Sequence, residues 1–278
     1  MKKIIISLSM IAAVAAIAVG ATTAFFSDTE TSTGNTFTAG AIDLGVDNTS
    51  YLNGALNPGT TWGLDFDIDN TEFPGDNLET PEVENGYSLP IVRQFFNFID
   101  LKPGDLGEDT ISLHVNNNDS YLCADVTLTS TLDNSSTEPE MDDGDTLWTI
   151  DNTGELQNYV KFVWWADDGD NVLETDENPI HENVPLGTGT VALADSDQNI
   201  WGDNGPLPGG SDRFIGKAWC FGQLTLEPVD EGVSPIVDGG VRCNGENVNN
   251  LSQTDSMSAD IAFRAVQSRN NPNFVCND

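Results

Sequence analysis

The chain has 278 residues, of which 45 are acidic and only 10 are Lys or Arg, so its formal net charge is −35 at neutral pH. This charge argues against nucleic acids and anionic membrane surfaces as partners, because both would repel the protein. It favours cations as ligands, and it opposes self-association at low ionic strength, where repulsion is least screened. The length is sufficient for one all-β domain with insertions.

The segment 1–24 is typical of a secretory signal. Lys2 and Lys3 form a positive start, an apolar stretch follows over 4–19, and small residues at 22–24 offer a cleavage site. The alternative is a retained membrane anchor, but the apolar stretch is shorter than the roughly 20 residues that span a bilayer. We therefore expect cleavage after Ala24 and a secreted protein, extracellular or at the cell surface, with no stable membrane span.

The rest of the chain is predicted to form strands separated by turns. Over 61–68, apolar residues alternate with small or polar ones, which is the pattern of a half-buried strand. The segments 111–115 and 121–132 flank an Asn-rich turn and predict a hairpin. Other candidate strands cover 36–46, 91–101, 159–166, 213–226 and 258–266, and one helical turn is expected at 154–158. The expected fold is all-β: an antiparallel β-sandwich, jelly-roll-like, with long acidic loops and little helix.

Four cysteines remain after export, which predicts two disulfides in a secreted protein. The absence of any CxxC spacing makes a zinc site a poor alternative. We favour Cys220–Cys243 as a local bridge and Cys123–Cys276 as a long-range one, and the two other pairings remain open.

Acidic loops at 69–88, 133–145, 167–185 and 195–212 are expected to be solvated, but part of one has a second interpretation. Calcium takes six to eight oxygen ligands, and closely spaced Asp and Asn around a Gly can wrap such an ion. The sequence DDGDN at 167–171 is similar to dockerin-type and EF-hand loops, although it lacks their full spacing. The candidate calcium ligands are Asp167, Asp168, Asp170, Asn171, Glu174, Asp176 and Glu177. Calcium is the one cofactor that we expect, if there is any.

Catalytic motifs are missing from the sequence. The two histidines, His114 and His181, form no HExxH motif, and there is no GxSxG, P-loop or dinucleotide-binding fingerprint. We expect a protein that is not an enzyme, and a secreted hydrolase is the least supported class.

Three segments resemble one known family. The segment 21–47 reads ATTAFFSDTETSTGNTFTAGAIDLGVD and is similar to the start of the TasA/camelysin family of secreted proteins. LKPGDLGEDTISLHVNNNDSYLCADVTL at 101–128 and IAFRAVQ at 261–267 resemble its middle and closing strands. The resemblance implies cleavage by a dedicated signal peptidase before FFSD, a flexible segment at 25–35, and a single β-sandwich domain over 36–278. Camelysin-like members have been classed as metallopeptidases, but without paired histidines that activity is not carried over.

The resemblance also implies a function. It predicts a structural subunit of an extracellular fibre or biofilm matrix, whose N-terminal segment inserts into the next subunit. An extended segment can complete an open sheet edge, and head-to-tail contacts of this kind build open filaments. The apolar residues of the donated segment would be Phe25, Phe26, Phe37, Ile42 and Leu44. The partners would be further copies of the chain and other matrix proteins.

Two alternatives remain open. The segment 37–46 could pair within its own subunit as an ordinary first strand. The protein could also be a monomeric calcium- or glycan-binding protein of the cell surface.

Overall fold

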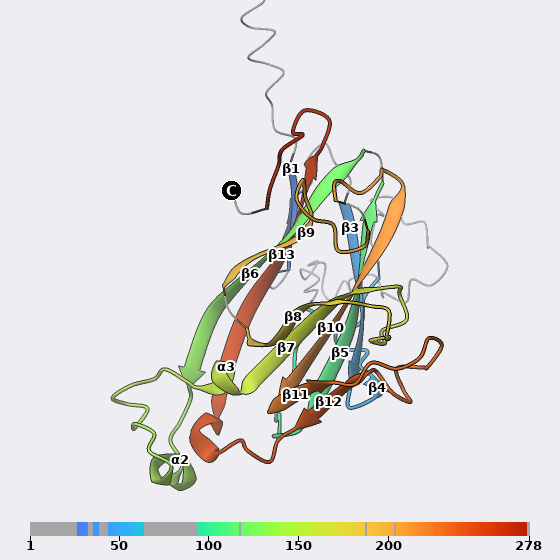
Figure 1. Cartoon of the computed structure of the whole chain (residues 1–278). Helices are drawn as coiled ribbons and strands as arrows, with labels where there is room; N and C mark the ends of the chain where they lie inside the picture. The colour runs from blue at the N-terminus through green and yellow to red at the C-terminus, as the bar shows by residue number, and fades with distance from the viewer. Residues whose placement is uncertain are drawn as a thin grey trace, which may run out of the picture.

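The fold is an antiparallel β-sandwich (Figure 1). The computed structural model describes residues 27–32, 36–38, 44–63, 94–116, 118–186, 188–202 and 204–276. The expected signal segment therefore lies outside the described residues, as do Phe25, Phe26 and Ile42. No helix in the described part of the chain is long and apolar enough to cross a membrane.

The strands form two large sheets and one small ribbon. The first sheet has the order β2-β1-β13-β6-β9, with β1 (Ser27–Ser32), β2 (Thr36–Thr38), β6 (Ser120–Asp133), β9 (Gly189–Ala194) and β13 (Asp255–Gln267). The second has the order β4-β3-β5-β10-β7-β8, with β3 (Leu44–Leu52), β4 (Ala55–Leu56), β5 (Leu106–Val115), β7 (Val160–Asp167), β8 (Pro179–Pro185) and β10 (Ser211–Phe221). The ribbon pairs β11 (Gln223–Leu226) with β12 (Val241–Asn244). Helical structure is limited to α2 (Glu138–Asp142), α3 (Leu156–Tyr159) and the 3₁₀ turn η1 (Asn250–Ser252).

The pairing of the strands is that of a jelly roll. Setting β2, β3, β4 and the β11–β12 ribbon aside, the chain runs through β1, β5, β6, β7, β8, β9, β10 and β13. The first of these pairs with the last, β5 with β10, β6 with β9, and β7 with β8. A long hairpin wound onto itself has this pattern, and it gives a two-sheet jelly roll. The predicted fold class is confirmed.

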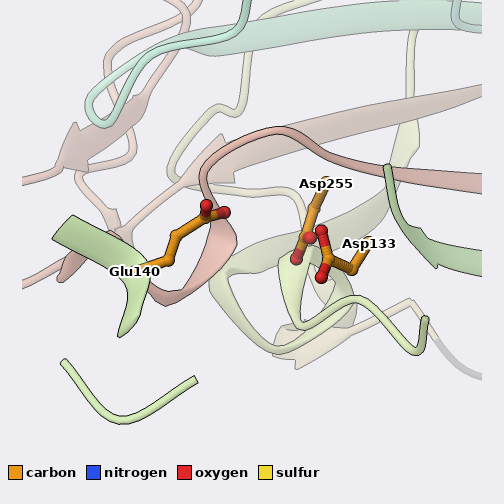
Figure 2. A group of neighbouring side chains, drawn as sticks. All are labelled: Asp133, Glu140 and Asp255. Carbon is orange, nitrogen blue, oxygen red and sulfur yellow. The ribbon is translucent and has the colours of Figure 1, made fainter. Parts of the chain in front are cut away.

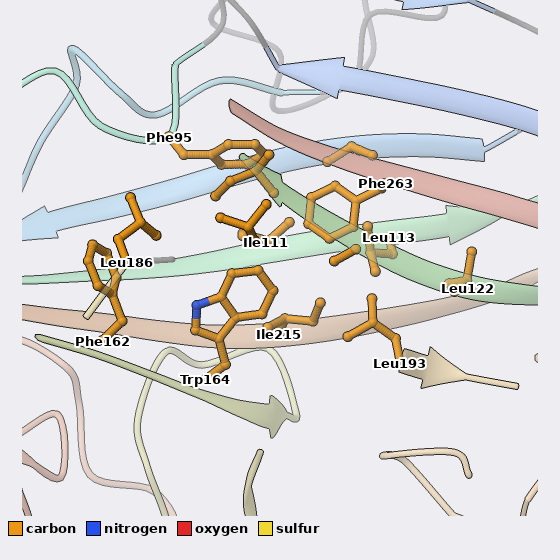
Figure 3. Packing of buried hydrophobic residues seen from close by; sticks show 14 of the residues in the cluster. Phe95, Ile111, Leu113, Leu122, Phe162, Trp164, Leu186, Leu193, Ile215 and Phe263 are labelled. Carbon is orange, nitrogen blue, oxygen red and sulfur yellow. The ribbon is translucent and has the colours of Figure 1, made fainter. Parts of the chain in front are cut away.

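The core lies between the two sheets and follows from the alternation of side chains along each strand. Alternate residues of β5, Ile111 and Leu113, are fully buried and face the other sheet, where Leu122 and Phe263 lie (Figure 3). Successive side chains of a strand point to opposite faces of its sheet, so the residues between Ile111 and Leu113 and their like face away from this core. Aromatic rings from the 94–101 segment, such as Phe95, extend this core without forming a strand.

Several strand predictions are corrected by the structure. The hairpin expected from 111–115 and 121–132 does not form, because β5 and β6 belong to different sheets. Their apolar faces meet across the core, so the turn between them carries the chain from one sheet to the other. Of the segment 61–68, the described part forms only a bridge between Trp62 and Asn48. The segment 213–226 divides into β10 and β11.

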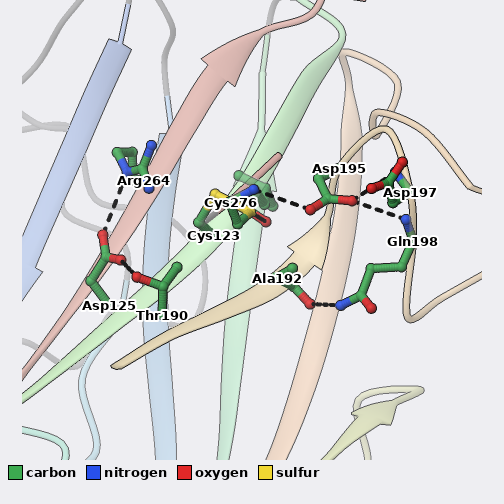
Figure 4. Close-up of a disulfide and its surroundings, with 10 residues drawn as sticks. Cys123, Asp125, Thr190, Ala192, Asp195, Asp197, Gln198, Arg264 and Cys276 are labelled. Atoms are coloured by element: carbon green, nitrogen blue, oxygen red, sulfur yellow. Dashed lines mark hydrogen bonds and ion pairs between the residues drawn. A yellow bond between two sulfur atoms is a disulfide. The ribbon is translucent and has the colours of Figure 1, made fainter. Parts of the chain in front are cut away.

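The two disulfides have the pairing that the sequence favours. Cys123 of β6 is joined to Cys276, with 5.6 Å between their Cα atoms, and Cys220 of β10 to Cys243 of β12, at 5.3 Å. Figure 4 shows how the first bridge fixes the C-terminal segment beside β6, where Asp195 Oδ2 accepts the backbone N–H of Cys276 at 3.1 Å.

The two bridges should contribute unequally to stability. Replacing Cys123 and Cys276 by Ser should lower the free energy of unfolding by about 5 kcal/mol, because this bridge closes a loop of 153 positions in the unfolded chain. The same change at Cys220 and Cys243, which are 23 positions apart, should cost about 3 kcal/mol. Denaturant unfolding of the two double variants measures the difference. An equal loss, or a larger loss for the short loop, would contradict this expectation.

Candidate functional site

The acidic loop at 167–177, between β7 and β8, begins at a buried carboxylate. Asp167 is the last residue of β7, and its side chain folds the following chain back on itself. Its Oδ2 atom accepts the backbone N–H groups of Gly169 at 3.2 Å and Asn171 at 3.3 Å, and its Oδ1 accepts Trp165 Nε1–H at 3.2 Å. Because Gly169 and Asn171 both have positive φ angles, of 115° and 65°, the turn is tight.

A second carboxylate joins the two ends of this loop. Glu177 accepts the backbone N–H of Asp168 at 3.1 Å and that of Glu174 at 3.0 Å. The middle of the loop is attached to a neighbouring segment, since Leu173 donates its N–H to Gly239 O and accepts that of Val229, both at 3.0 Å. The loop is therefore held in one conformation by main-chain contacts, which is what an ion site on a loop requires.

The carboxylates of the loop converge in two overlapping groups. One oxygen from each of Asp167, Asp168 and Glu177 lies within 4.8 Å of the others, and the same holds for Asp168, Asp170 and Glu174. Asp168 belongs to both groups and is exposed. Asp176, the remaining carboxylate among the expected ligands, is exposed and lies outside both groups.

Two buried polar side chains of the loop have atoms without a partner. Asn171 and Glu174 are each only 2% exposed. Even so, the oxygen and nitrogen of the Asn171 amide have no hydrogen-bond partner, and Glu174 Oε1 has none either. Leaving such atoms buried and unpaired costs free energy, so they usually have a partner in the native protein. Among the ion pairs formed by the described residues, none involves a carboxylate of this loop.

Burial and mutual repulsion change the acidity of these groups. The pKa of Asp167 is raised to about 7, mainly by burial and in smaller part by the nearby charges of Asp170 and Asp168. Burial is also the main cause of the raised pKa values of Glu174 and Glu177, which interact with each other. A site that holds protons this strongly for lack of positive charge can exchange them for a metal cation. Asp167, Asp168, Asp170, Glu174, Glu177 and the Asn171 oxygen fit the all-oxygen ligand set that calcium prefers.

Two other sets of ionisable groups pair between neighbouring strands. Lys217 and Asp109 face each other across β10 and β5, both fully buried, with Nζ and Oδ2 2.7 Å apart. His114 lies between Asp212 and Asp47, with distances of 2.7 and 3.0 Å from its ring nitrogens, and its hydrogen bond to Asp47 is the largest cause of its raised pKa. These groups join neighbouring strands.

The residues expected to mediate assembly are only partly described. β1 pairs with β13 from Ser27↔Val266 to Ser32↔Ile261, and β2, which contains Phe37, pairs with β1. Leu44 is 1% exposed and begins β3, so it lies in the core of its own chain. For this part of the segment 37–46, the structure thus has the alternative arrangement, in which the segment pairs within its own subunit.

The fold and the acidic loop together define a disulfide-bonded jelly-roll domain with a candidate cation site. Within that class, residues 1–77 match the family model described as Camelysin metallo-endopeptidase. This match confirms the TasA/camelysin resemblance for the N-terminal part of the chain. No curated protein matches the chain.

Without calcium, the protein should lose stability between about pH 4 and about pH 7. The loop carboxyls have a higher pKa in the folded than in the unfolded chain. Their stabilising contribution is therefore complete below the unfolded pKa of about 4, and it is lost as pH rises through the folded pKa, about 7 for Asp167. Melting temperatures in chelator should fall by several degrees, and millimolar calcium should reduce the fall because it replaces the protons.

Two variants test the origin of this pH dependence. Glu177→Gln removes a half-buried titrating group and should flatten the pH profile in chelator. Asp176→Asn removes the same charge from an exposed position outside both carboxylate groups and should keep the profile of the unaltered protein. A melting temperature that rises with pH in chelator would contradict the predicted sign.

Proposed function

We propose that the protein is a secreted structural subunit of an extracellular fibre or biofilm matrix, and that copies assemble by donation of the N-terminal strand. The observation that carries this proposal is the position of β1. It is the first described strand of the chain, and it pairs along its whole length with β13, the last one. If β1 leaves, β13 presents an unpaired edge over 261–266.

The pairing of β1 suits exchange between copies. Its sequence is SDTETS, so it contributes main-chain hydrogen bonds to the sheet without a row of large apolar side chains. The same antiparallel ladder can form when the strand comes from another copy, because main-chain hydrogen bonds do not depend on which chain supplies them. A head-to-tail exchange does not close on itself and gives a filament.

The charge of the protein sets a condition for such assembly. Copies that carry a formal charge of −35 repel each other, and salt screens that repulsion. We therefore expect assembly to need high ionic strength or divalent cations.

Deleting residues 25–34, which include all of β1, should leave folded monomers that do not polymerise. Negative-stain electron microscopy of the protein from Phe25 onward should show filaments in high salt with calcium, and the deletion variant should show none under the same conditions. Circular dichroism confirms that the variant is folded. Filaments formed by the deletion variant would reject strand donation.

A cross-linking experiment separates exchange between copies from pairing within one copy. Thr31 and Ala262 are opposite each other in the β1–β13 register, so Thr31→Cys with Ala262→Cys should form a disulfide in either case. Strand donation gives a ladder of covalently joined chains on a denaturing gel, whereas internal pairing gives cross-linked monomers only. The off-register pair Ser27→Cys with Ala262→Cys is the control and should not cross-link.

A second candidate function is calcium binding by a monomeric surface protein, which the unpartnered atoms of Asn171 and Glu174 favour. Calorimetric titration of calcium should show binding in the millimolar range or tighter, and the Asp168→Ala, Asp170→Ala variant should lose the site in this loop. Binding without filaments in any condition would favour this candidate over the fibre subunit.

We also propose that the chain is not a peptidase, although the matching family is named for that activity. The sequence lacks the HExxH pattern that binds catalytic zinc. Hydrolysis of casein that disappears with a chelator would overturn this proposal.

A further inference from the structure

A second group of carboxylates lies where β6 ends and β13 begins, away from the 167–177 loop in the sequence. Asp133 is the last residue of β6, Asp255 is the first residue of β13, and the two are paired in register. Glu140 comes from α2, in the segment that follows β6. We call these three residues the Asp133 cluster. One oxygen from each of them lies within 4.8 Å of the others (Figure 2).

In each of the two aspartates, one carboxylate oxygen accepts backbone N–H groups and the other carboxylate oxygen has no partner. Asp133 Oδ1 accepts the backbone N–H of Ser135 at 3.0 Å, and Oδ2 has no partner although the residue is only 4% exposed. Asp255 Oδ2 accepts the backbone N–H groups of Glu155 and Leu156, at 2.5 and 3.0 Å, and its Oδ1 is buried without a partner. Such anchoring orients a carboxylate toward a ligand in the way that outer contacts orient metal ligands.

Glu140 is positioned by the start of its own helix. It closes a capping box with Thr137, in which Glu140 Oε2 accepts the Thr137 N–H at 2.5 Å. The side chain is fully buried, so its charge lies close to the other two carboxylates at a place where bulk solvent screens it little.

Two further acids surround the cluster, and no positive side chain offsets them in the described structure. Asp145 Oδ2 and Glu155 Oε2 are also buried without a hydrogen-bond partner. None of the ion pairs of the described residues includes any of these five carboxylates. The pKa of Asp255 is raised to about 6 and that of Glu155 to about 7, mainly by burial and in smaller part by neighbouring carboxylates. The site lacks positive charge.

We propose that Asp133, Glu140 and Asp255 form a calcium-binding site, separate from the acidic loop. Calcium suits such a site better than magnesium, because it accepts six to eight oxygen ligands in a flexible geometry. Magnesium demands a near-ideal octahedron and gives up its water reluctantly. Water and the Asp145 and Glu155 carboxylates would complete the six to eight ligands.

A cation at this position would have a structural effect. It would tie α2 and the segment 134–156 to the paired ends of β6 and β13. Gly154 already lies so close that a Cβ atom there would be 2.7 Å from Leu132 main-chain atoms and 2.9 Å from Asp255 Cγ. The segment is thus packed directly against the cluster, and ordering by calcium should extend along it.

Calcium titration by calorimetry tests the proposal on the protein from Phe25 onward that carries Asp168→Ala and Asp170→Ala, so that the acidic loop does not contribute. One site should remain, and magnesium should bind it more weakly. Adding Asp133→Asn and Asp255→Asn should weaken calcium binding at least tenfold. The matched control, Asp142→Asn, removes a charge from an exposed residue of α2 outside the cluster and should leave the affinity unchanged. Equal binding with and without the two cluster substitutions would overturn the proposal.

A second measurement covers the case in which the cluster variant does not fold. In the protein with an intact cluster, calcium should slow amide hydrogen exchange at least tenfold over residues 134–156, with little change at the far end of β6. Exchange in this segment that does not respond to calcium would overturn the proposal without any variant of the cluster.

Discussion

Repulsion between carboxylates is the force that the rest of this structure must overcome. With 45 acidic and 10 basic residues, most carboxylates have no basic side chain to pair with. Two of the paired basic residues lie at strand contacts: Lys217 joins β10 to β5, and Arg264 lies 3.4 Å from Asp125, which also accepts a hydrogen bond from Thr190 of β9 (Figure 4). Cohesion therefore comes mainly from the apolar core between the sheets and from the two disulfides, which limit how far the unfolded chain can expand.

The same constraint explains why acidic residues gather where strands end. Inside a sheet, alternate side chains are buried and unpaired charges there are costly, whereas a strand end leaves room for loops that bring several carboxylates together. Asp167 at the end of β7 and Asp133 at the end of β6 both start such a loop. In both places one oxygen is used to shape the loop by accepting backbone N–H groups. Other carboxylate oxygens in each cluster remain without a partner.

Local patterns predicted several strands and the favoured cysteine pairs, but not how the strands are arranged. The segment 91–101 forms no strand in its described part, and β8 lies in a segment that was expected to be a loop. Ile111 and Leu113 alternate with polar residues, so the strand was evident, yet its partner depends on the whole chain because β10 lies about a hundred residues further on. The expected hairpin failed for that reason. The acidic loop was recognisable since its ligands are close in sequence. The Asp133 cluster was not, because Asp255 comes from the opposite end of the domain and the segment 133–145 resembles any solvated acidic loop.

The antiparallel ladder between β1 and β13 has a mechanical consequence. Its hydrogen bonds run perpendicular to both strands, so a pull along β1 loads all the bonds of Ser27–Ser32 in shear at once, instead of opening them one after another. On the other side of this joint, β13 is paired with β6 from Asp255 to Gln267, and Cys276 is covalently attached to β6. Tension that enters through the N-terminal strand is thus passed to the broad centre of a sheet that a covalent bond prevents from unravelling at the C-terminal end.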